Sequence, residues 1–141
     1  MGVRAGDLPP APRRRRVLVV DDDAAVRGMF AAVLRADGFD VAAAPDGLAA
    51  LDLLRRERFA VVLVDYAMPR LDGLAMLRRL HETGFDTPVI FVSGSLEASR
   101  ESEAQRLGAV AILSKPPDLH RLLRLCHELS GRASALPHGG G

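Results

Sequence analysis

The sequence predicts an α/β domain built on an open, doubly wound parallel sheet of five strands. Short apolar runs of four or five residues alternate along the chain with segments of helical periodicity. Parallel strands need a crossover between them, usually a helix. The apolar runs lack alternating polar residues, as expected of strands that are buried on both faces. The alternation and the unbroken runs together predict a (βα)5 architecture with helices on both faces of the sheet.

The first half of the chain supplies three strands and two helices. A helix from about residue 24 to residue 37 carries apolar side chains at helical spacing, and Gly38 ends it. A second helix carries Leu48, Leu51 and Leu54 and has an arginine-rich end. The strands are predicted at residues 16–20, 41–44 and 60–64.

The second half adds two strands and three helices. After a loop rich in proline and glycine, a helix that contains Leu74 ends at Gly84. A fourth helix is predicted near residues 97–107 and ends at Gly108. The remaining elements are strands at residues 89–92 and 109–113 and a last helix at residues 118–129.

Both ends of the chain lack periodicity. Residues 1–15 and 131–141 are rich in proline, glycine, alanine and arginine. We therefore expect a flexible basic N-terminal arm and a flexible C-terminal tail around a domain at residues 16–130. The 141 residues, of which 48% are hydrophobic and 26% charged, suffice for one compact domain.

Charge and cysteine content narrow the function classes. Residues 17–130 carry 13 basic and 17 acidic groups, so the positive charge lies on the arm and we expect no direct nucleic-acid binding. The single cysteine, Cys126, excludes an internal disulfide and fits a cytoplasmic location. It falls on an apolar helical stripe, which indicates a core position. No run is long and apolar enough for a membrane span or a signal sequence, so we expect no membrane partner.

Polar side chains follow four of the predicted strands. They are Asp21, Asp22 and Asp23 after the first strand, Asp65 after the third, Ser93 after the fourth, and Ser114 and Lys115 after the fifth. Ligands of such sheets bind beyond the carboxyl ends of the strands. Clustered carboxylates repel one another unless a cation is present. An all-oxygen set of this kind selects Mg²⁺ or Mn²⁺.

A carboxylate, a hydroxyl and an ammonium around Mg²⁺ suit phosphoryl transfer, in which the protein positions the donor and places positive charge around the phosphoryl oxygens. Asp65 is the candidate nucleophile. Asp22 would bind the metal directly and Asp21 through water. Ser93 would donate to one phosphoryl oxygen, and Lys115 would neutralise another. Lys115 is also the one lysine beside eighteen arginines, which favours a role that arginine cannot fill.

Plainer interpretations hold for several neighbouring residues. Asp23 and Asp72 are most simply N-caps of the helices that follow them. Tyr66 and Met68 are more simply packing groups beside the site than reactive ones. Capping does not explain Asp21 and Asp22 as well, because a third carboxylate and a lysine occur at the matching ends of other strands.

Four segments, VLVVDDD, VVLVDYAMPRLDG, PVIFVSG and GAVAILSKPP, resemble the ordered signatures of the response-regulator receiver domain over residues 16–130. The resemblance implies a flavodoxin-like fold. It implies phosphorylation of Asp65 by a phosphohistidine of a sensor histidine kinase or histidine phosphotransfer protein. It also implies Mg²⁺ held by Asp22, Asp65 and the backbone carbonyl of Ala67, with Asp21 helping. The peptide between Lys115 and Pro116 is similar to one that is cis in the family.

Two positions depart from the family pattern. Members usually carry an aromatic residue at the position of Ile112, where the ring moves with the switch hydroxyl, and many carry Phe where this chain has Pro117. Ser93 and Ile112 are thus the switch positions. We hypothesise that Ser93 moves and residues 94–98 carry the signal without aromatic repacking.

Three functions remain open. The first is a stand-alone phosphoacceptor that signals to a downstream target protein and is an enzyme only in self-catalysed phosphotransfer and autodephosphorylation; the short stretch after the domain favours it. The second is the receiver portion of a larger DNA-binding regulator or hybrid kinase. The third is a Mg²⁺-dependent aspartyl-phosphate phosphatase, in which a second acid usually stands where this chain has Ala67.

The family also dimerises or binds targets through its fourth and fifth helices. We expect a phosphorylation-linked homodimer there, with Arg121 and Arg124 set against Glu101 and Glu103.

Overall fold

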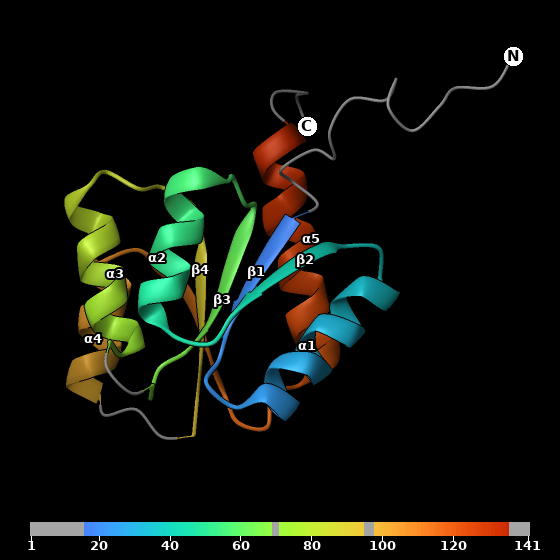
Figure 1. Ribbon diagram of the computed structural model, residues 1–141, viewed down its shortest axis with the longest axis horizontal. Helices are drawn as coiled ribbons and strands as arrows, with labels where there is room; N and C mark the ends of the chain where they lie inside the picture. Colours follow the sequence, from blue (N-terminus) through green and yellow to red (C-terminus); the bar gives the residue numbers. More distant parts are fainter. Residues whose placement is uncertain (1–15, 69–70, 95–97, 136–141) are drawn as a thin grey trace, which may run out of the picture.

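The structure is a computed structural model that describes residues 16–68, 71–94 and 98–135 (Figure 1). The predicted basic arm, residues 1–15, lies outside the described residues. Strands and helices alternate along the described chain. They are β1 (Arg16–Val20), α1 (Ala24–Ala36), β2 (Asp40–Ala44), α2 (Gly47–Arg56), β3 (Val61–Asp65), α3 (Gly73–Glu82), β4 (Val89–Ser93), α4 (Ala98–Arg106), β5 (Ala109–Ser114) and α5 (Leu119–Ala135).

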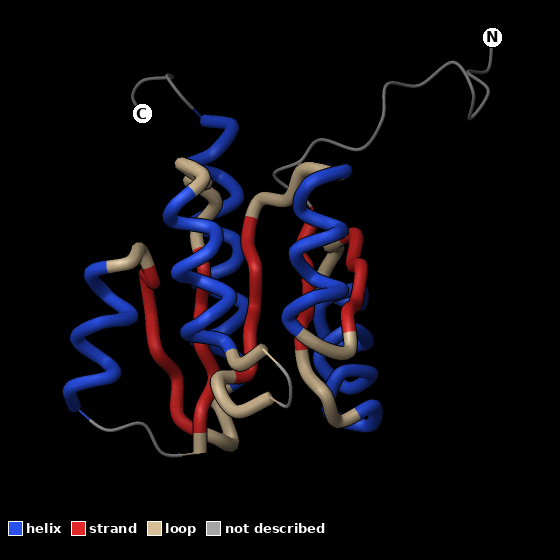
Figure 2. Tube along the Cα trace, turned by 60° about the vertical axis from the view of Figure 1, so that its left-hand side comes forward, coloured by secondary structure: helices blue, strands red, loops and turns tan. Residues whose placement is uncertain are grey.

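The strands form one parallel sheet in the order β2-β1-β3-β4-β5, and Figure 2 shows them side by side. The chain moves outward from β1 to β2, returns to the other side of β1, and continues from β3 to β5. The winding therefore reverses between β1 and β3, which is where an open sheet of this kind binds its ligand. The predicted doubly wound (βα)5 fold is confirmed.

Each face of the sheet has its own hydrophobic core. Helices α1 and α5 cover one face, and α2, α3 and α4 cover the other (Figure 1). Leu18 and Val20 pack on the side of α2 to α4, whereas Val17 and Val19 pack on the side of α1 and α5, because successive residues of a strand point to opposite faces. Both faces are buried, as the unbroken apolar runs predict.

The core position expected for Cys126 is confirmed, since the residue is fully buried in the core beneath α5. Burial raises the pKa of its thiol to about 12. A thiol with such a pKa stays protonated at neutral pH and is a poor nucleophile.

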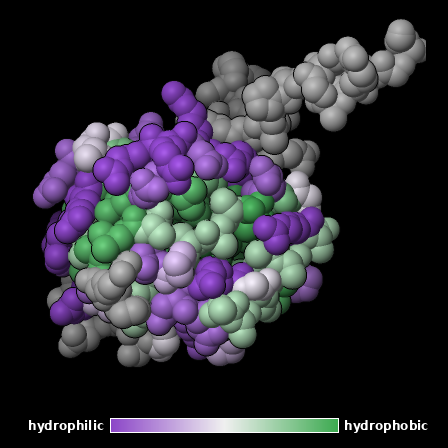
Figure 3. Space-filling model, in the orientation of Figure 1, coloured by the Kyte–Doolittle hydropathy of each residue, from purple (hydrophilic) through white to green (hydrophobic). Residues whose placement is uncertain are grey.

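The hydrophobic surface over α2 and α3 is less completely covered. Figure 3 shows hydrophobic residues at the front of the molecule, where these helices lie, bordered by hydrophilic ones. Leu48 of α2 is 42% exposed, and with Leu51, Leu54 and Phe85 it lines a hollow between the two helices.

Capping residues set the ends of the helices as predicted. Asp23 accepts hydrogen bonds from the backbone N–H groups of Ala25 and Val26 at the start of α1, and Asp72 accepts one from Ala75 at the start of α3. Each such cap stabilises a helix by about 1 kcal/mol.

Three glycines end helices in the left-handed region, which favours a residue without a Cβ atom. They are Gly38 at φ 96°, Gly84 at φ 77° and Gly108 at φ 108°.

The strands extend one residue further than the apolar runs suggest. Asp65, Ser93 and Ser114 are the last residues of β3, β4 and β5 rather than the first residues after them. The ladder continues because it is a backbone pattern: the N–H of Tyr66 still donates to the carbonyl of Val92, at 3.1 Å.

The last helix is longer than predicted. It ends at Ala135 rather than at residue 129, so a flexible tail from residue 131 is wrong for residues 131–135. Gly131 lies within the helix and does not have a positive φ. Leu129 and Ser130, which precede the glycine, are both buried, and a glycine inside a helix costs about 1 kcal/mol relative to alanine. Residues 136–141 lie outside the described residues.

None of the helices among the described residues is both long and apolar enough to cross a bilayer.

Candidate functional site

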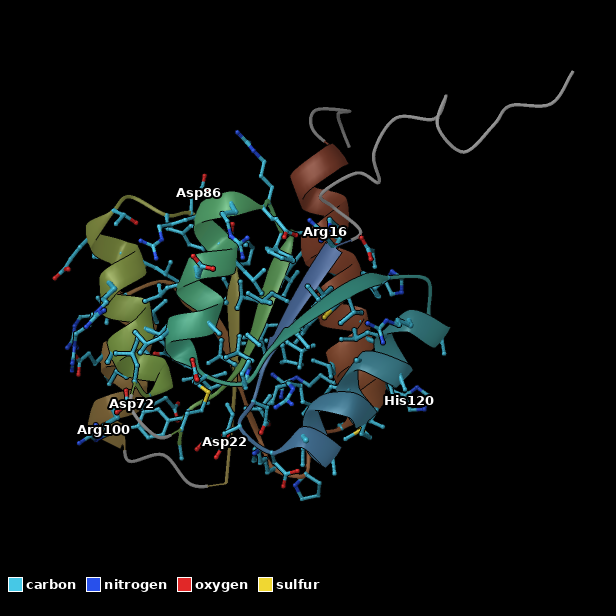
Figure 4. The ribbon with its side chains drawn as sticks, viewed as in Figure 1. Arg16, Asp22, Asp72, Asp86, Arg100 and His120 are labelled. Atoms are coloured by element: carbon cyan, nitrogen blue, oxygen red, sulfur yellow. The ribbon has the colours of Figure 1, made fainter. Side chains whose placement is uncertain are left out.

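The candidate site lies at the carboxyl ends of β1, β3, β4 and β5, where the predicted polar residues meet. Asp21, Asp65 and Ser93 are buried there, with exposures of 2%, 7% and 5%. Asp22 is exposed, and Figure 4 shows it at this end of the sheet. One acid of the group therefore faces solvent while two are enclosed by protein.

Three carboxylates and one ammonium form the centre of the site. Asp21, Asp22 and Asp65 each offer an oxygen within 4.8 Å of the others. The Nζ atom of Lys115 lies 3.3 Å from Oδ1 of Asp65 and 3.7 Å from Oδ2 of Asp21. Three negative charges thus face one positive charge, which leaves an excess of negative charge in a partly buried place.

Hydrogen bonds hold Asp21 in position. Its carboxylate accepts a hydrogen bond from the backbone N–H of Asp23 at 2.9 Å, and its carbonyl accepts one from Nη1 of Arg27 at 2.6 Å. Its own N–H donates to the carbonyl of Ala44 in β2 at 3.2 Å. The backbone of the buried acid is therefore held by contacts from two elements, and one hydrogen bond orients its carboxylate.

The pKa of Asp65 is raised above its ordinary value. Burial is the main cause and the charge of Asp21 is the second, because both disfavour the carboxylate form. Lys115 and the backbone N–H of Ala67 act in the opposite direction but do not cancel the effect. A cation at the site would offset the repulsion between the carboxylates, which contributes to this raised pKa.

The acidic triad fits a magnesium ion by the chemistry of its donors. All the ligand atoms are carboxylate oxygens, and the exposed Asp22 leaves one side open to water. Mg²⁺ keeps several waters and binds one or two carboxylates rather than a complete protein cage. The described residues contain no cluster of cysteines and histidines with metal-binding geometry, so nothing in this part of the chain suits zinc better.

Backbone pairing places Ser93 and Lys115 next to each other. The N–H of Lys115 donates to the carbonyl of Ser93 at 2.9 Å. The peptide between Lys115 and Pro116 is cis, as the family resemblance implies. Both predicted phosphoryl-binding side chains therefore start from one edge of the site, at the ends of β4 and β5.

The glycine at the start of α3 lets that helix approach the site. A Cβ atom at Gly73 would lie 2.8 Å from the ring of Phe91 and 3.1 Å from the carbonyl oxygen of Asp65. The N–H of Gly73 donates to the carbonyl of Tyr66 at 2.9 Å. The start of α3 is therefore held against the backbone of Asp65 and Tyr66, beside the acid.

The remaining predicted residues lie around this centre. Ile112 is half-buried and packs against the core beneath α2 to α4. Met68 is buried in the same core, as its interpretation as a packing group predicts. Ala67 is exposed, and the structure places its N–H at Asp65. Its role as a carbonyl ligand stays a prediction.

Sequence reasoning missed two contacts of the site. Nη1 of Arg100, in α4, donates to the hydroxyl of Tyr66 at 2.6 Å, and Arg27 binds the carbonyl of Asp21. The arginine of α1 follows the aspartates by about one helical turn, which is a weak signal. Nothing in the sequence pairs residue 66 with residue 100, because the contact joins the loop after β3 to α4 across a separation of 34 residues.

Glu103 of the fourth helix has an ion-pair partner within the chain. It pairs with Arg78 of α3 at 2.7 Å. Helices α3 and α4 lie on the same face of the sheet, and α5 covers the opposite face (Figure 1). The expected interface through the fourth and fifth helices stays a prediction.

The family model and the known proteins that match this sequence agree with one another. Residues 17–127 match the family model of the response regulator receiver domain. The chain is 40% identical over 119 residues to the response regulator MprA of Mycobacterium sp. (strain KMS), which covers 84% of this chain and 52% of that protein. For MprA of Mycobacterium avium (strain 104) the identity is 40% over 108 residues, with 77% and 47% covered. The chain thus spans about half the length of these curated relatives.

Solved structures show the same likeness. The receiver domain of the Francisella response regulator 1452 has a TM-score of 0.80 and 30% identity, and the match covers 84% of this chain and 98% of that one. A CheY-like receiver domain protein from Methanospirillum hungatei JF-1 has a TM-score of 0.79 and 26% identity, with 84% and 94% covered.

Proposed function

The chain belongs to the response regulator receiver domain family of two-component signalling, and we propose that it is a phosphoacceptor that takes a phosphoryl group on Asp65. The observation that carries the proposal is the group of Asp21, Asp22 and Asp65 with Lys115 beside it. Asp65 combines a buried position with direct contact to the one lysine of the chain.

The transfer step forms an aspartyl phosphate. A carboxylate oxygen of Asp65 attacks the phosphorus of a phosphohistidine in a partner, the phosphorus–nitrogen bond breaks, and the leaving imidazole nitrogen keeps the electron pair and takes a proton. The hydroxyl of Ser93 donates to one phosphoryl oxygen. The Nζ atom of Lys115 stays close enough to Asp65 to neutralise another.

Magnesium is the cofactor of this proposal, with Mn²⁺ as a substitute. Asp22, Asp65 and the carbonyl of Ala67 would hold it directly, and Asp21 would help. When bound, the ion supplies positive charge for the phosphoryl oxygens. Burial of Asp21 and exposure of Asp22 suit these roles, because the exposed acid lies where a hydrated ion enters.

The partners follow from the family. Receiver domains interact with histidine kinases. We propose a sensor histidine kinase or a histidine phosphotransfer protein as donor, a downstream protein as target, and a cytoplasmic location. The negative charge of residues 17–130 supports contact with protein rather than with nucleic acid.

A homodimer through α4 and α5 is part of the proposal. Arg121 and Arg124 are exposed on α5, and Val110 on the edge strand β5 is 50% exposed. Light scattering after size exclusion, with Mg²⁺ and beryllofluoride as the phosphoryl mimic, should give a higher mass than without the mimic. Equal monomer masses would remove the dimer from the proposal.

The test of the proposed function is labelling with a small phosphodonor. Wild type in acetyl phosphate and Mg²⁺ should gain one phosphoryl group by intact mass, and Asp65→Asn should gain none. Asp86→Asn is the matched control, because Asp86 is an exposed acid at the opposite end of the sheet (Figure 4). Label that persists on Asp65→Asn would disprove the assignment, and repeated turnover of phosphate esters would favour a phosphatase.

A further inference from the structure

Tyr66 lies between the core and the fourth helix. Its ring makes an edge-to-face contact with the buried ring of Phe91, with centroids 6.4 Å apart and planes at 88°. Its hydroxyl accepts a hydrogen bond from Nη1 of Arg100 at 2.6 Å, and the guanidinium carbon of Arg100 lies 5.9 Å from the ring centroid. The tyrosine is therefore held on one side by β4 and on the other by α4.

Each of the two residues in this contact follows one residue of the proposed switch in the chain. Tyr66 follows the phosphoacceptor Asp65 directly in the chain, and α4, which carries Arg100, follows Ser93. Figure 4 shows Arg100 at the same end of the sheet as Asp22. A change in the distance between Asp65 and Ser93 would therefore change the relative position of Tyr66 and Arg100.

The contact occurs in a chain that lacks the usual aromatic switch residue. Ile112 has no ring, and it packs against the same core as Tyr66. Tyr66 is the one tyrosine of the chain. The aromatic side chain that adjoins both the site and α4 is thus supplied by the loop after β3 and not by β5.

We propose that the Tyr66–Arg100 contact holds α4 in the unphosphorylated arrangement and opens when Asp65 is phosphorylated. The inference rests on the proposed function. When the hydroxyl of Ser93 moves to the phosphoryl group, the end of β4 and the start of α4 move with it. A hydrogen bond weakens steeply with distance and angle, so a small displacement of α4 breaks this contact.

Linkage sets the direction of the effect. A contact present only in the unphosphorylated arrangement opposes binding of the phosphoryl group or its mimic, and its removal strengthens that binding by the same factor. A hydrogen bond of this kind corresponds to a factor of about five. Arg100 acts through the position of α4, so it is a positioning residue and not a catalytic one.

The experiment uses Tyr66 as its own probe. Because the chain has one tyrosine and no tryptophan, tyrosine emission reports on this side chain alone. Emission of wild type with Mg²⁺ should change when beryllofluoride is added. Arg100→Ala should have the altered emission before addition, change little afterwards, and bind beryllofluoride about fivefold more tightly. Arg106→Ala, which removes an exposed arginine from the other end of α4, should behave as wild type.

A second variant tests whether the two side chains act together. Tyr66→Phe keeps the ring and removes the hydroxyl, and it should tighten beryllofluoride binding as much as Arg100→Ala does, measured by the thermal shift. The double variant should show no further gain. Additive gains, or unchanged or weaker binding in Arg100→Ala, would overturn the inference.

Failure of the proposed function is distinguishable from failure of this inference. If wild type with Mg²⁺ shows no thermal shift with beryllofluoride, both fall. If wild type binds the mimic while the emission of Tyr66 stays unchanged, the phosphoacceptor function stands and the regulatory contact falls. Asp65→Asn should show neither response.

Discussion

A cluster of charged side chains lies at each end of β1, and the two clusters differ in their exposure to solvent. At the start of the strand, Nε of Arg16 lies 3.0 Å from Asp40, Nη2 lies 2.8 Å from Glu57, and the guanidinium stacks 4.7 Å from the ring centroid of Phe59. At the other end, Asp21 joins a group of three acids with one lysine. Figure 4 shows Arg16 and Asp22 at opposite ends of the molecule.

Exposure to solvent determines how strongly the charges in each cluster interact. The acids at the Arg16 end are exposed, with side-chain exposures of 52% and 37%, so water screens their excess charge. Burial of Arg16 lowers its pKa, but the bonds to Glu57 and Asp40 outweigh burial and raise it. In the site, Asp21 and Asp65 are buried and the pKa of Asp65 is raised by burial and by repulsion. An exposed paired group stabilises the fold, whereas a buried acidic excess is suited to receive a cation.

The largest effect is expected for Lys115→Arg. The guanidinium keeps the charge but replaces a compact point charge with a broad fork, and the site is crowded by Asp21 and Asp65. Folding and Mg²⁺ binding should stay normal, and the rate of labelling by acetyl phosphate should fall about a hundredfold. Arg16→Lys is the matched control at the opposite end and should label at the wild-type rate. Normal labelling of Lys115→Arg would show that any cation suffices.

Magnesium should stabilise the fold through the site alone. At a concentration one hundred times its Kd, Mg²⁺ should raise the free energy of unfolding of wild type by about 2.7 kcal/mol. Asp22→Asn should lose most of this gain, and Arg16→Ala should keep all of it. Urea unfolding with Mg²⁺ or with a chelator measures both, and a full Mg²⁺ gain in Asp22→Asn would contradict the predicted ligand set.

Arg16→Ala should destabilise the fold without affecting phosphorylation. It removes two partly exposed ion pairs and the contact with Phe59, which together contribute about 1–2 kcal/mol. Part of the loss should disappear at high salt, because screening weakens exposed pairs. Urea unfolding at low and high salt measures it. A labelling rate reduced in proportion to stability would show that the two ends are coupled.

Asp65→Asn should stabilise the protein in Mg²⁺-free buffer, by about 1 kcal/mol at neutral pH, because it removes one of the repelling charges. The folded-state pKa of Asp65 is raised, so the folded protein binds the proton more tightly than the unfolded chain. The destabilisation of the fold by the Asp65 carboxylate is therefore complete above the raised pKa. It disappears as the pH falls toward the ordinary pKa of 3.8. Urea unfolding across this range should show the advantage of Asp65→Asn shrinking with falling pH.

Much of the fold and of the site could be predicted from local patterns. Short segments of sequence determine the alternation of apolar runs and helices. They also determine where helices start and end, at the caps Asp23 and Asp72 and at Gly38, Gly84 and Gly108. The candidate residues of the site follow from one rule of parallel sheets, that the carboxyl ends of all strands meet at one edge. These inferences needed no knowledge of which distant segments touch.

The structure decided what depends on distant contacts. Helix α5 continues past Gly131 to Ala135, although a glycine is a common signal for the end of a helix. Glu103 pairs with Arg78 because α3 and α4 share a face of the sheet, which no local pattern of charges reveals.

By itself, the sequence determined that the strands are parallel and that the acids lie at one edge of the sheet, and it made Asp65 the candidate acceptor. Only the tertiary structure decided that Asp21 and Asp65 are buried while Asp22 is exposed, and that Tyr66 meets Arg100. The physical reason is range. Periodicity and turn chemistry act between neighbours in the chain, whereas burial and side-chain contacts arise when β3, β4 and α4 come together.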